Sequence, residues 1–376
     1  MKLEKLGNIA TIKTGKYDVN HSTPDGEYVF YTCAFGQFKS PTYSFEGPAI
    51  ILPGNGANVG EVFYYDGKFE AYQRTYVVQN FKADPNYIYA YFKAQWKNSL
   101  RNKQFGSATN YIRLNNLTDF TIALPSLPDQ LHISNLLSKA ENLISQRKES
   151  IRLLDEFLKS TFTKMFGNPV TNVNGLKIEK LKEFIVFLTS GGRGWNKYYS
   201  DNGGRFIRSY DVQMNYLSND DAVYVNPPNN QEAKRTLVKP KDILLTVTGS
   251  KIGRATMVPL DFGIGYVSQH VAIIRVKDIN PLYLSYYLSD NNCGQYIIGK
   301  NQYGQTKPGL NFKQIENFEI IIPPTELQTQ FAQIVEKTKA LKIQYQQSLQ
   351  ELENLYGSLS QRAFRGELTI NKALSV

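Results

Sequence analysis

Pro125-Ser126-Leu127-Pro128-Asp129-Gln130 and Pro323-Pro324-Thr325-Glu326-Leu327-Gln328 decide the fold, because each introduces a long polar run that is typical of a helix. The second segment lies 198 positions after the first, and the same offset relates Gly106 to Gly304, Phe120 to Phe318 and Phe166 to Phe364. Near the start, Leu3-Glu4-Lys5-Leu6 is echoed by Ile178-Glu179-Lys180-Leu181 at an offset of only 175, so the second half carries 23 extra residues. Two related modules predict a pseudo-two-fold symmetric protein, which suits a two-part partner.

The composition of the 376 residues is that of a folded, basic protein. Hydrophobic residues make up 41%, enough for real cores, and 43 Lys and Arg against 33 Asp and Glu give a net charge of +10. This excess of cations favours a polyanionic partner, although many basic proteins have none. With two cysteines, no apolar leader and no apolar run long enough for a bilayer, we expect a cytoplasmic protein without a membrane partner.

We expect an α+β fold in which two tandem mixed α/β domains are separated by two long helices. Short apolar runs such as residues 48–53 and 242–247 predict strands, and residues 85–96 and 281–288 predict Tyr-rich helices. Each domain has an ordinary size. The expected segments are a first domain at 1–127, a long helix at 128–168, a second domain at 169–322, a second long helix at 323–366 and a tail at 367–376.

Both long helices carry apolar residues at alternating three- and four-residue spacing, which predicts an antiparallel coiled coil. At about 1.5 Å per residue each helix is about 55–60 Å long. A domain of this size has a radius of gyration of only about 14–15 Å, so packing on its own domain alone would leave each helix overhanging. The expected contact positions are Leu137, Ala140, Ile144, Arg147, Ile151, Leu154, Leu158, Thr161 and Met165, then Phe331, Ile334, Thr338, Leu341, Tyr345, Ser348, Leu352, Leu355 and Leu359.

The outer faces of the helices carry further aromatic residues. They offer a surface that a partner can bury, or alternatively they complete the contact between the two helices. These residues are Phe157, Phe162, Phe166, Phe331, Tyr356 and Phe364.

Catalytic motifs are poor in this sequence. His21, His132 and His270 lie far apart without a carboxylate or cysteine at ligand spacing, so we expect no metal site. The glycine-rich segment 54–60 lacks the lysine and hydroxyl of a phosphate loop, which argues against an ATP-driven motor. The segment 226–229, Asn-Pro-Pro-Asn, is close to an adenine methyltransferase motif, but it lacks the aromatic residue and a glycine-rich turn for a methyl donor. We therefore interpret it as a turn.

Loops rich in amides, hydroxyls and cations recur at equivalent places in the two halves. Residues 248–254 follow a predicted strand and combine two cations with backbone amides and hydroxyls, which suits phosphates, whereas the matching residues 54–60 carry asparagines. The loops around Gly106 and Gly304 carry groups that read base edges. Any one of these residues is more often a solvated surface group, and it is their recurrence that favours DNA binding. Predicted contacts in the first half are Thr14, Lys16, Tyr17, Asn55, Asn58, Arg74, Gln104, Ser107, Thr109, Asn110 and Arg113. Those in the second half are Ser190, Arg193, Trp195, Lys197, Thr248, Ser250, Lys251, Arg254, His270, Gln302, Tyr303, Gln305, Thr306 and Lys307.

Over nearly its whole length the chain resembles the specificity subunit of Type I restriction-modification systems. The resemblance rests on the order of motifs repeated in each half. These motifs are the paired Leu/Ile-Glu-Lys-Leu starts, Gly56/Gly60 and Gly249/Gly253, Gln73 and Gln269, the Gly106 and Gly304 loops, and the two proline hinges before the long helices. The resemblance implies two target recognition domains, each reading one half of a bipartite double-stranded DNA site through the major groove, with the helix length setting the gap.

The resemblance also implies that this chain is not an enzyme and binds no cofactor. Two modification subunits would bind S-adenosylmethionine and methylate adenine, and restriction subunits would use ATP and Mg²⁺ to translocate and cut. Because the two halves differ in loop chemistry, we expect an asymmetric site. The alternatives are a recognition subunit of a Type IIB-like or other phage-defence system, and a scaffold or adaptor that does not bind DNA.

Overall fold

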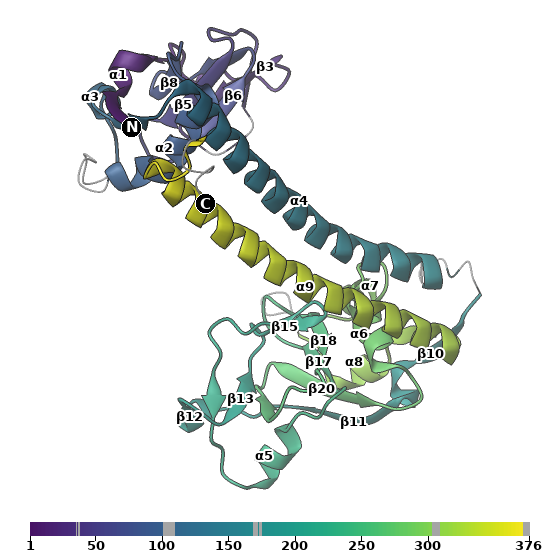
Figure 1. Ribbon diagram of the computed structural model, residues 1–376. Helices are drawn as coiled ribbons and strands as arrows, with labels where there is room; N and C mark the ends of the chain where they lie inside the picture. The colour runs from purple at the N-terminus through teal and green to yellow at the C-terminus, as the bar shows by residue number, and fades with distance from the viewer. Residues whose placement is uncertain are drawn as a thin grey trace. The chain divides into compact units, whose positions relative to one another are not determined.

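A computed structural model describes residues 1–34, 36, 38–100, 110–167, 172, 175–302 and 309–370, and Figure 1 shows its helices and strands. Residue contacts divide the chain into two units. Unit 1 comprises residues 1–149 and 346–376, and unit 2 comprises residues 150–345. Each unit contains one mixed domain together with a part of two long helices, α4 (Leu127–Phe166) and α9 (Thr325–Phe364).

In the described part of unit 1, the domain is built on three small sheets. Strand β1 (Lys2–Lys5) pairs antiparallel with β9 (Thr121–Leu124), which joins the start of the domain to its end. A four-stranded antiparallel sheet has the order β2-β8-β5-β6, and a three-stranded sheet has the order β4-β3-β7, in which β3 and β7 are parallel. The other bounds are β2 Thr11–Thr14, β3 Tyr28–Tyr31, β4 Phe38–Ser40, β5 Pro48–Pro53, β6 Phe63–Asp66, β7 Phe69–Ala71, β8 Thr75–Gln79, α1 Leu6–Ile9, η1 Val19–His21, α2 Pro85–Ser99 and α3 Leu114–Thr118.

Strand β5 is apolar on both faces because both faces of its sheet are covered. Ile50 and Leu52 point into the core that contains α2, whereas Ala49 and Ile51 point into the core shared with β7. Helix α2 starts where the side chain of Asp84 accepts a hydrogen bond from a backbone N–H of its first turn, directly before a proline at the first helical position.

Among its described residues, the domain of unit 2 contains two four-stranded sheets and two two-stranded ones, of orders β11-β20-β17-β18, β12-β16-β13-β19, β10-β21 and β14-β15. Its strands are β10 Lys177–Lys180, β11 Ile185–Ser190, β12 Tyr199–Ser200, β13 Gly204–Ile207, β14 Val212–Gln213, β15 Tyr216–Leu217, β16 Tyr224–Val225, β17 Ile243–Thr246, β18 Ala255–Met257, β19 Gly265–Val267, β20 Val271–Val276 and β21 Glu319–Ile322. Its helices, apart from the long ones, are η2 Leu181–Glu183, η3 Trp195–Tyr198, α5 Gln231–Thr236, α6 Pro281–Ser289, α7 Gly294–Asn301 and α8 Phe312–Glu316.

The two domains share one topology, which confirms the predicted repeat and the α+β fold class. The order β2-β8-β5-β6 in unit 1 corresponds to β11-β20-β17-β18 in unit 2, and the parallel pair β3 and β7 corresponds to β13 and β19. The outer pair β1 and β9 corresponds to β10 and β21. Strands β12, β14 and β15 and helix α5 have no counterpart among the described residues of unit 1, so most of the extra length of the second half lies there.

Within each unit, α4 and α9 run antiparallel. In unit 1, Nζ of Lys148 lies 2.8 Å from Oε1 of Glu353. In unit 2, Nζ of Lys342 lies 2.6 Å from Oδ1 of Asp155. In unit 1, Glu141, earlier on α4 than Lys148, accepts from Tyr356, later on α9 than Glu353. In unit 2, Phe162, later on α4 than Asp155, packs on Phe331, earlier on α9 than Lys342. Within each unit, later residues of α4 thus pair with earlier residues of α9, which confirms the predicted direction of pairing.

The predicted contact positions are correct along α4 but only partly along α9. Every predicted α4 position is buried or half-buried, whereas Leu341 and Leu355 of α9 are 36% and 50% exposed. Val335, which the pattern omits, is fully buried. An α-helix has about 3.6 residues per turn, whereas a strict alternation of three and four residues assumes about 3.5. Over the 40 residues of α9, positions chosen by the strict alternation therefore rotate away from the face that contacts α4.

The ends of the long helices belong to the domain cores. Phe162, Phe166 and Phe331 are buried in the core of unit 2, and Phe364 packs against the core of unit 1. The prediction that these side chains face a partner is therefore wrong, and only Phe157, at 49% exposure, fits it. Because the helix ends complete the cores, the contact-based units do not coincide with the five expected segments. In the part of the chain that the structure describes, no helix is both long and apolar enough to span a membrane.

Candidate nucleic-acid interface

In unit 1, backbone hydrogen bonds bring four loops together at one end of the sheet β2-β8-β5-β6. The N–H of Gly54 donates to the carbonyl of Arg74 at 2.9 Å, and the N–H of Gly56 donates to the carbonyl of Asn110 at 2.8 Å. The N–H of Gly15 donates to the carbonyl of Thr75 at 3.4 Å. The loops that sequence analysis chose separately are therefore neighbours. They enclose a cleft of about 250 Å³ lined by Thr14, Gly54, Asn55, Gln73, Arg74, Tyr76, Tyr111 and Ile112.

Glycine is required at two kinds of position in these loops. A Cβ on Gly15 would lie 1.6 Å from the carbonyl oxygen of Ala71, and its counterpart Gly191 meets a carbonyl oxygen at 1.9 Å. Gly56 and Gly249 have φ of +89° and +95°, which L-residues with side chains rarely adopt. The repeated glycines therefore reflect a tight loop geometry common to both units.

Most of the predicted contacts in unit 1 face solvent. Exposed side chains among the described residues are those of Thr14, Lys16, Tyr17, Arg74, Asn110 and Arg113. Tyr17 stacks on His21 with ring centroids 3.8 Å apart. Asn55 and Asn58 are half-buried, and Asn58 donates to the carbonyl of Cys33 at 2.8 Å, so it holds its own loop.

Unit 2 repeats this loop arrangement. The N–H of Val247 donates to the carbonyl of His270 at 2.9 Å, and the N–H of Leu310 donates to the carbonyl of Val247 at 2.9 Å. Thr248 forms a bridge with Gly309, as Asn55 does with Tyr111 in unit 1. The segments after β11, β17 and β19 therefore meet as the equivalent segments of unit 1 do.

The charged groups at equivalent positions differ between the units. Position 74 is arginine and its counterpart 270 is histidine, while Asn58 corresponds to Lys251 and Glu61 to Arg254. Arg193, Lys197 and Ser250 are exposed, and Ser190, Thr248, Lys251, Arg254, His270 and Gln302 are half-buried.

Trp195 is a core residue rather than a surface contact. It is 3% exposed, stacks on Phe206 with ring centroids 5.5 Å apart, and donates from Nε1 to Glu232 at 3.0 Å. Its burial argues against direct contact with DNA. The predicted contacts Gln104, Ser107, Thr109, Tyr303, Gln305, Thr306 and Lys307 lie outside the described residues.

Sequence reasoning missed several residues near these loops. Gln73 and Tyr111 line the cleft of unit 1, and Gln73 donates to Asp18 at 3.2 Å. The recurrence of Gln73 as Gln269 was a usable signal for the first of them. Arg235 of α5 hydrogen bonds the carbonyl of Ser190, a contact for which the sequence carries no signal because α5 lies in the extra segment.

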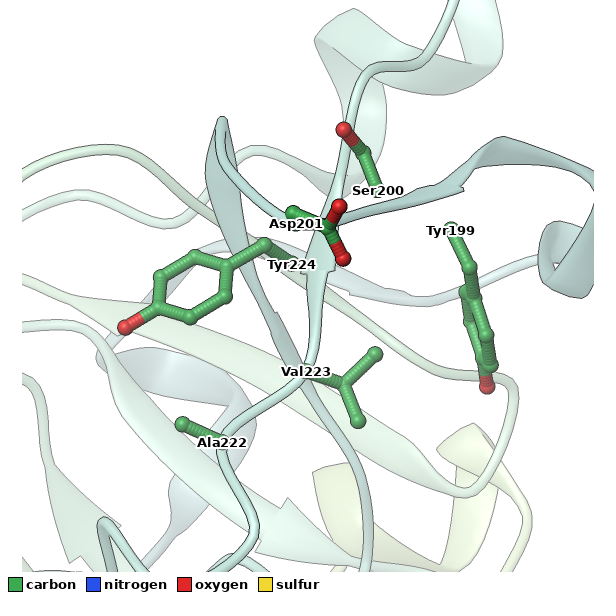
Figure 2. A pocket seen from close by; sticks show the side chains of 6 residues that line it. All are labelled: Tyr199, Ser200, Asp201, Ala222, Val223 and Tyr224. Atoms are coloured by element: carbon green, nitrogen blue, oxygen red, sulfur yellow. The ribbon is translucent and has the colours of Figure 1, made fainter.

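Unit 2 contains a surface hollow of its own, away from the loop cluster, that does not fit a polyanion. Figure 2 shows it beside β12 and β16, lined by Tyr199, Ser200, Asp201, Ala222, Val223 and Tyr224. Asp201 is the one charged residue of this lining, and its carboxylate repels phosphate. Among the described residues, no three His, Cys, Asp or Glu side chains come together as a metal site would need.

The chain has two similar domains, each with an equivalent loop cluster and each joined to parts of two long helices. This arrangement defines a class of subunits that contain two copies of one domain. The chain matches the family described as Type I restriction modification DNA specificity domain over residues 1–153 and 199–354, and it belongs to that family of Type I specificity subunits.

Individual relatives agree with this assignment. The Type I restriction enzyme EcoDI specificity subunit of Escherichia coli is 25% identical, over 98% of this chain and 88% of its own length. Among solved structures, the Type I restriction-modification system S subunit from M. genitalium superposes with a TM-score of 0.63 at 15% identity, covering 96% of each chain. A chain from a study of complex assembly and conformational transition of the Type I system gives 0.59 at 17% identity, covering 97% of this chain and 98% of that one. These two likenesses show the fold.

Proposed function

We propose that this chain recognises an asymmetric, bipartite site in double-stranded DNA, with one domain for each half-site. The observation that carries the proposal is the recurrence of one loop cluster on two copies of the same fold, with different side chains at equivalent positions. Arg74 of the first domain corresponds to His270 of the second, and Asn58 corresponds to Lys251. Identical loops would favour a palindromic site, whereas different loops favour two different half-sites.

The charge of the chain supports DNA as the partner. A net charge of +10 favours a phosphate backbone, and the exposed Lys16, Arg74 and Arg113 of unit 1 lie on or beside the loop cluster. Arg113 also lies over the ring of Tyr111, with its guanidinium carbon 5.8 Å from the ring centroid. Contacts from lysine and arginine to phosphates fix a protein on the duplex, while amides and cations held in one orientation read base edges.

In this proposal the chain is a non-catalytic scaffold for the other subunits of a Type I complex in the cytoplasm. Two modification subunits bind S-adenosylmethionine and methylate adenine, and restriction subunits use ATP and Mg²⁺. One similar structure comes from a study of complex assembly in the Type I system, which supports the assembly role. Exposed apolar side chains on the long helices, such as Leu143, Leu153 and Phe157, supply surface for such contacts.

Mapping N6-methyladenine across the genome by single-molecule sequencing, with this gene intact and deleted, tests the proposal. Loss of one split motif on deletion is the expected result and reveals the target directly. An unchanged map, together with DNA binding that salt abolishes without any sequence preference, contradicts it and favours a scaffold or adaptor that does not recognise DNA sequence. If no neighbouring gene encodes an ATP-dependent translocase, a Type IIB-like or other phage-defence system would be favoured instead.

A further inference from the structure

The second domain carries a hairpin that has no counterpart among the described residues of the first domain. Between β13 and β16 the chain runs through residues 208–223, which include β14 and β15, whereas the equivalent strands β3 and β4 of unit 1 are joined by residues 32–37 alone. The hairpin packs on β17 and β18, the two strands that flank loop 248–254. An element specific to unit 2 therefore adjoins the loop that carries Lys251 and Arg254.

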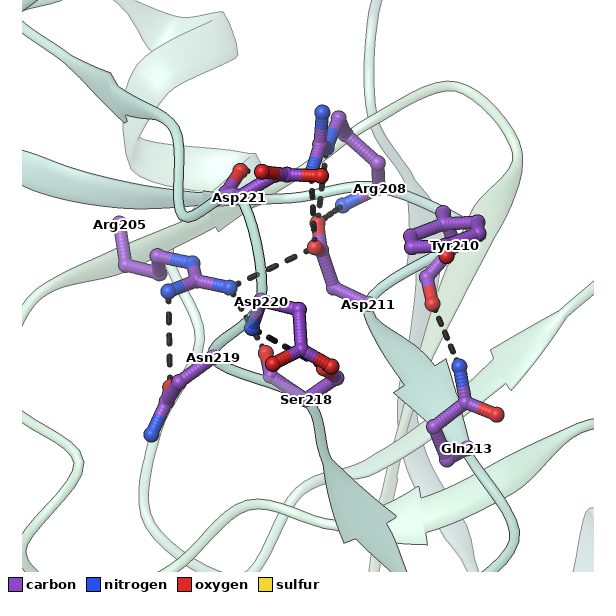
Figure 3. A network of polar contacts seen from close by, with 9 residues as sticks. All are labelled: Arg205, Arg208, Tyr210, Asp211, Gln213, Ser218, Asn219, Asp220 and Asp221. Atoms are coloured by element: carbon purple, nitrogen blue, oxygen red, sulfur yellow. Dashed lines mark hydrogen bonds and ion pairs between the residues drawn. The ribbon is translucent and has the colours of Figure 1, made fainter. Parts of the chain in front are cut away.

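A buried ion-pair network holds the base of this hairpin (Figure 3). The side chain of Asp211 is 1% exposed and accepts from Arg208 at 3.0 Å and from the backbone N–H of Arg208 at 2.7 Å. Arg205 donates to Asp211 at 3.4 Å and to the carbonyl of Ser218 at 2.8 Å. Because a buried carboxylate with several charge-assisted partners is held firmly, both ends of the hairpin are fixed.

The tip of the hairpin is fixed as well. Asn215 adopts φ of +63°, its N–H donates to the carbonyl of Ala255 at 2.9 Å, and its side chain accepts from Ser285 of α6 at 2.9 Å. Lys339 of α9 donates to the carbonyl of Asn215 at 3.1 Å. The hairpin is thus a rigid element of unit 2 rather than a loose loop.

Gln213 connects this rigid element to Arg254. Its Nε2 donates to the carbonyl of Tyr210 at 2.7 Å, as Figure 3 shows, and its Oε1 accepts from Nη1 of Arg254. One such bond orients a guanidinium without using all of its five N–H donors. The residue that corresponds to Arg254 in unit 1 is Glu61, which pairs with Lys97 at 3.2 Å, so the device is specific to unit 2.

We infer that Gln213 is a positioning residue that holds Arg254 for base reading at the half-site of the second domain. A flexible cation suits any phosphate, whereas an arginine held in one orientation suits the bidentate pattern of a guanine edge in the major groove. This assignment revises the phosphate role that the composition of loop 248–254 suggests. It rests on the proposed function and names the residue pair that gives the second half-site its selectivity.

Selection from a library of DNA duplexes with a randomised central region tests the inference with the full chain. The half-site whose selectivity falls with Arg254→Ala is that of the second domain. Gln213→Ala is expected to lower selectivity at the same half-site about tenfold, the scale of one bidentate base contact, while the other half-site is unchanged. Gln213→Glu keeps the acceptor for Arg254 but loses the donor to the carbonyl of Tyr210, so it is expected to restore part of the selectivity that Gln213→Ala loses. In the Arg254→Ala background, Gln213→Ala is expected to add nothing.

The matched control is Gln79→Ala in unit 1, because Gln79 also donates to a backbone carbonyl, that of Glu46, at 2.9 Å. It is expected to leave both half-sites unchanged. The inference is overturned if Gln213→Ala behaves like the wild type, if it lowers the melting temperature and weakens both half-sites equally, or if its effect adds to that of Arg254→Ala. If the wild-type chain enriches no sequence, the proposed function itself fails and this inference falls with it.

Discussion

The side-chain amide of Gln130 joins the start of α4 to the start of α2 in unit 1. Its Oε1 accepts from the backbone N–H of Asp84 at 2.9 Å, and its Nε2 donates to the carbonyl of Pro125 at 2.9 Å. Gln328 makes the same two bonds in unit 2. One buried glutamine per hinge therefore fixes the point at which each long helix leaves its domain.

Gln130→Ala is expected to destabilise unit 1 by about 1–3 kcal/mol, because it leaves a buried N–H and a carbonyl without partners. Urea unfolding followed by tryptophan fluorescence measures the loss of stability. The sequence has two tryptophans, Trp96 in unit 1 and Trp195 in unit 2. In a Trp195→Phe background the signal reports unit 1 alone. Gln361→Ala, at an exposed position of α9 in the same unit, is the control. Equal stability of both variants would show that the hinge bonds are dispensable.

Alkaline pH is expected to destabilise both domains through a repeated tyrosine. Tyr87 donates its hydroxyl to the carbonyl of Ala123 at 2.5 Å, and Tyr283 donates to that of Ile321 at 2.8 Å. Burial raises the pKa of Tyr87 and of Tyr283 well above the ordinary value. Above pH ~10 the unfolded tyrosine therefore loses a proton that the folded one retains, so stability is complete below this pH and falls as pH rises, by about 1.4 kcal/mol per pH unit for each tyrosine.

Tyr87→Phe is expected to remove its share of this alkaline decline. Unfolding free energies of the variant and the wild type, measured in urea at about pH 8 and about pH 11, give the two slopes. Tyr216→Phe is the control, because Tyr216 is 59% exposed. Identical slopes in all three proteins would mean that Tyr87 ionises in the folded state as it does in the unfolded one.

Trp195→Ala is expected to destabilise unit 2 by about 3–5 kcal/mol, as large-to-small changes in a core do. The reason is the loss of its packing against Phe206 and of its bond to Glu232. Thermal unfolding followed by far-ultraviolet circular dichroism provides the measurement. Trp195→Phe keeps an aromatic ring and is expected to cost less. A variant Trp195→Ala that melts like the wild type but binds DNA weakly would restore the surface role.

Features that repeat in the sequence were predictable from it. Gln130 and Gln328 recur at one offset, so the hinges, the repeated domains and the helices after them could be inferred together. The loops that carry Asn55 and Asn110 could be proposed as contacts for the same reason, although their adjacency appears only in the fold. Where both halves carry the same residue at equivalent positions, the structural role of that residue could thus be inferred from the sequence.

Contacts formed only by the fold could not be predicted in this way. Trp195 is buried by Phe206 and Glu232, which the chain brings from later segments, so its burial has no local signature. Gln213 contacts Arg254, which lies 41 positions later in the chain, and the hairpin that carries Gln213 has no copy in the part of the first half that the structure describes. Contacts made by unrepeated segments, such as those of Glu232 and Gln213, therefore could not be inferred from the sequence.

Lys251→Ala is expected to weaken binding to all DNA sequences about equally and to lower the slope of log affinity against log salt by about 1. Lys251 lies in the loop after β17, and under the proposed function we expect its ammonium to act as a point charge toward phosphate, without the fixed geometry that reads a base. Binding isotherms at several salt concentrations, on a selected duplex and on a scrambled one, measure both effects. Lys277→Ala is the matched control, because this exposed lysine lies at the opposite end of β20 from the loop cluster. A loss confined to the selected duplex would instead make Lys251 a base contact and would shift part of the second domain's selectivity from Arg254 to it.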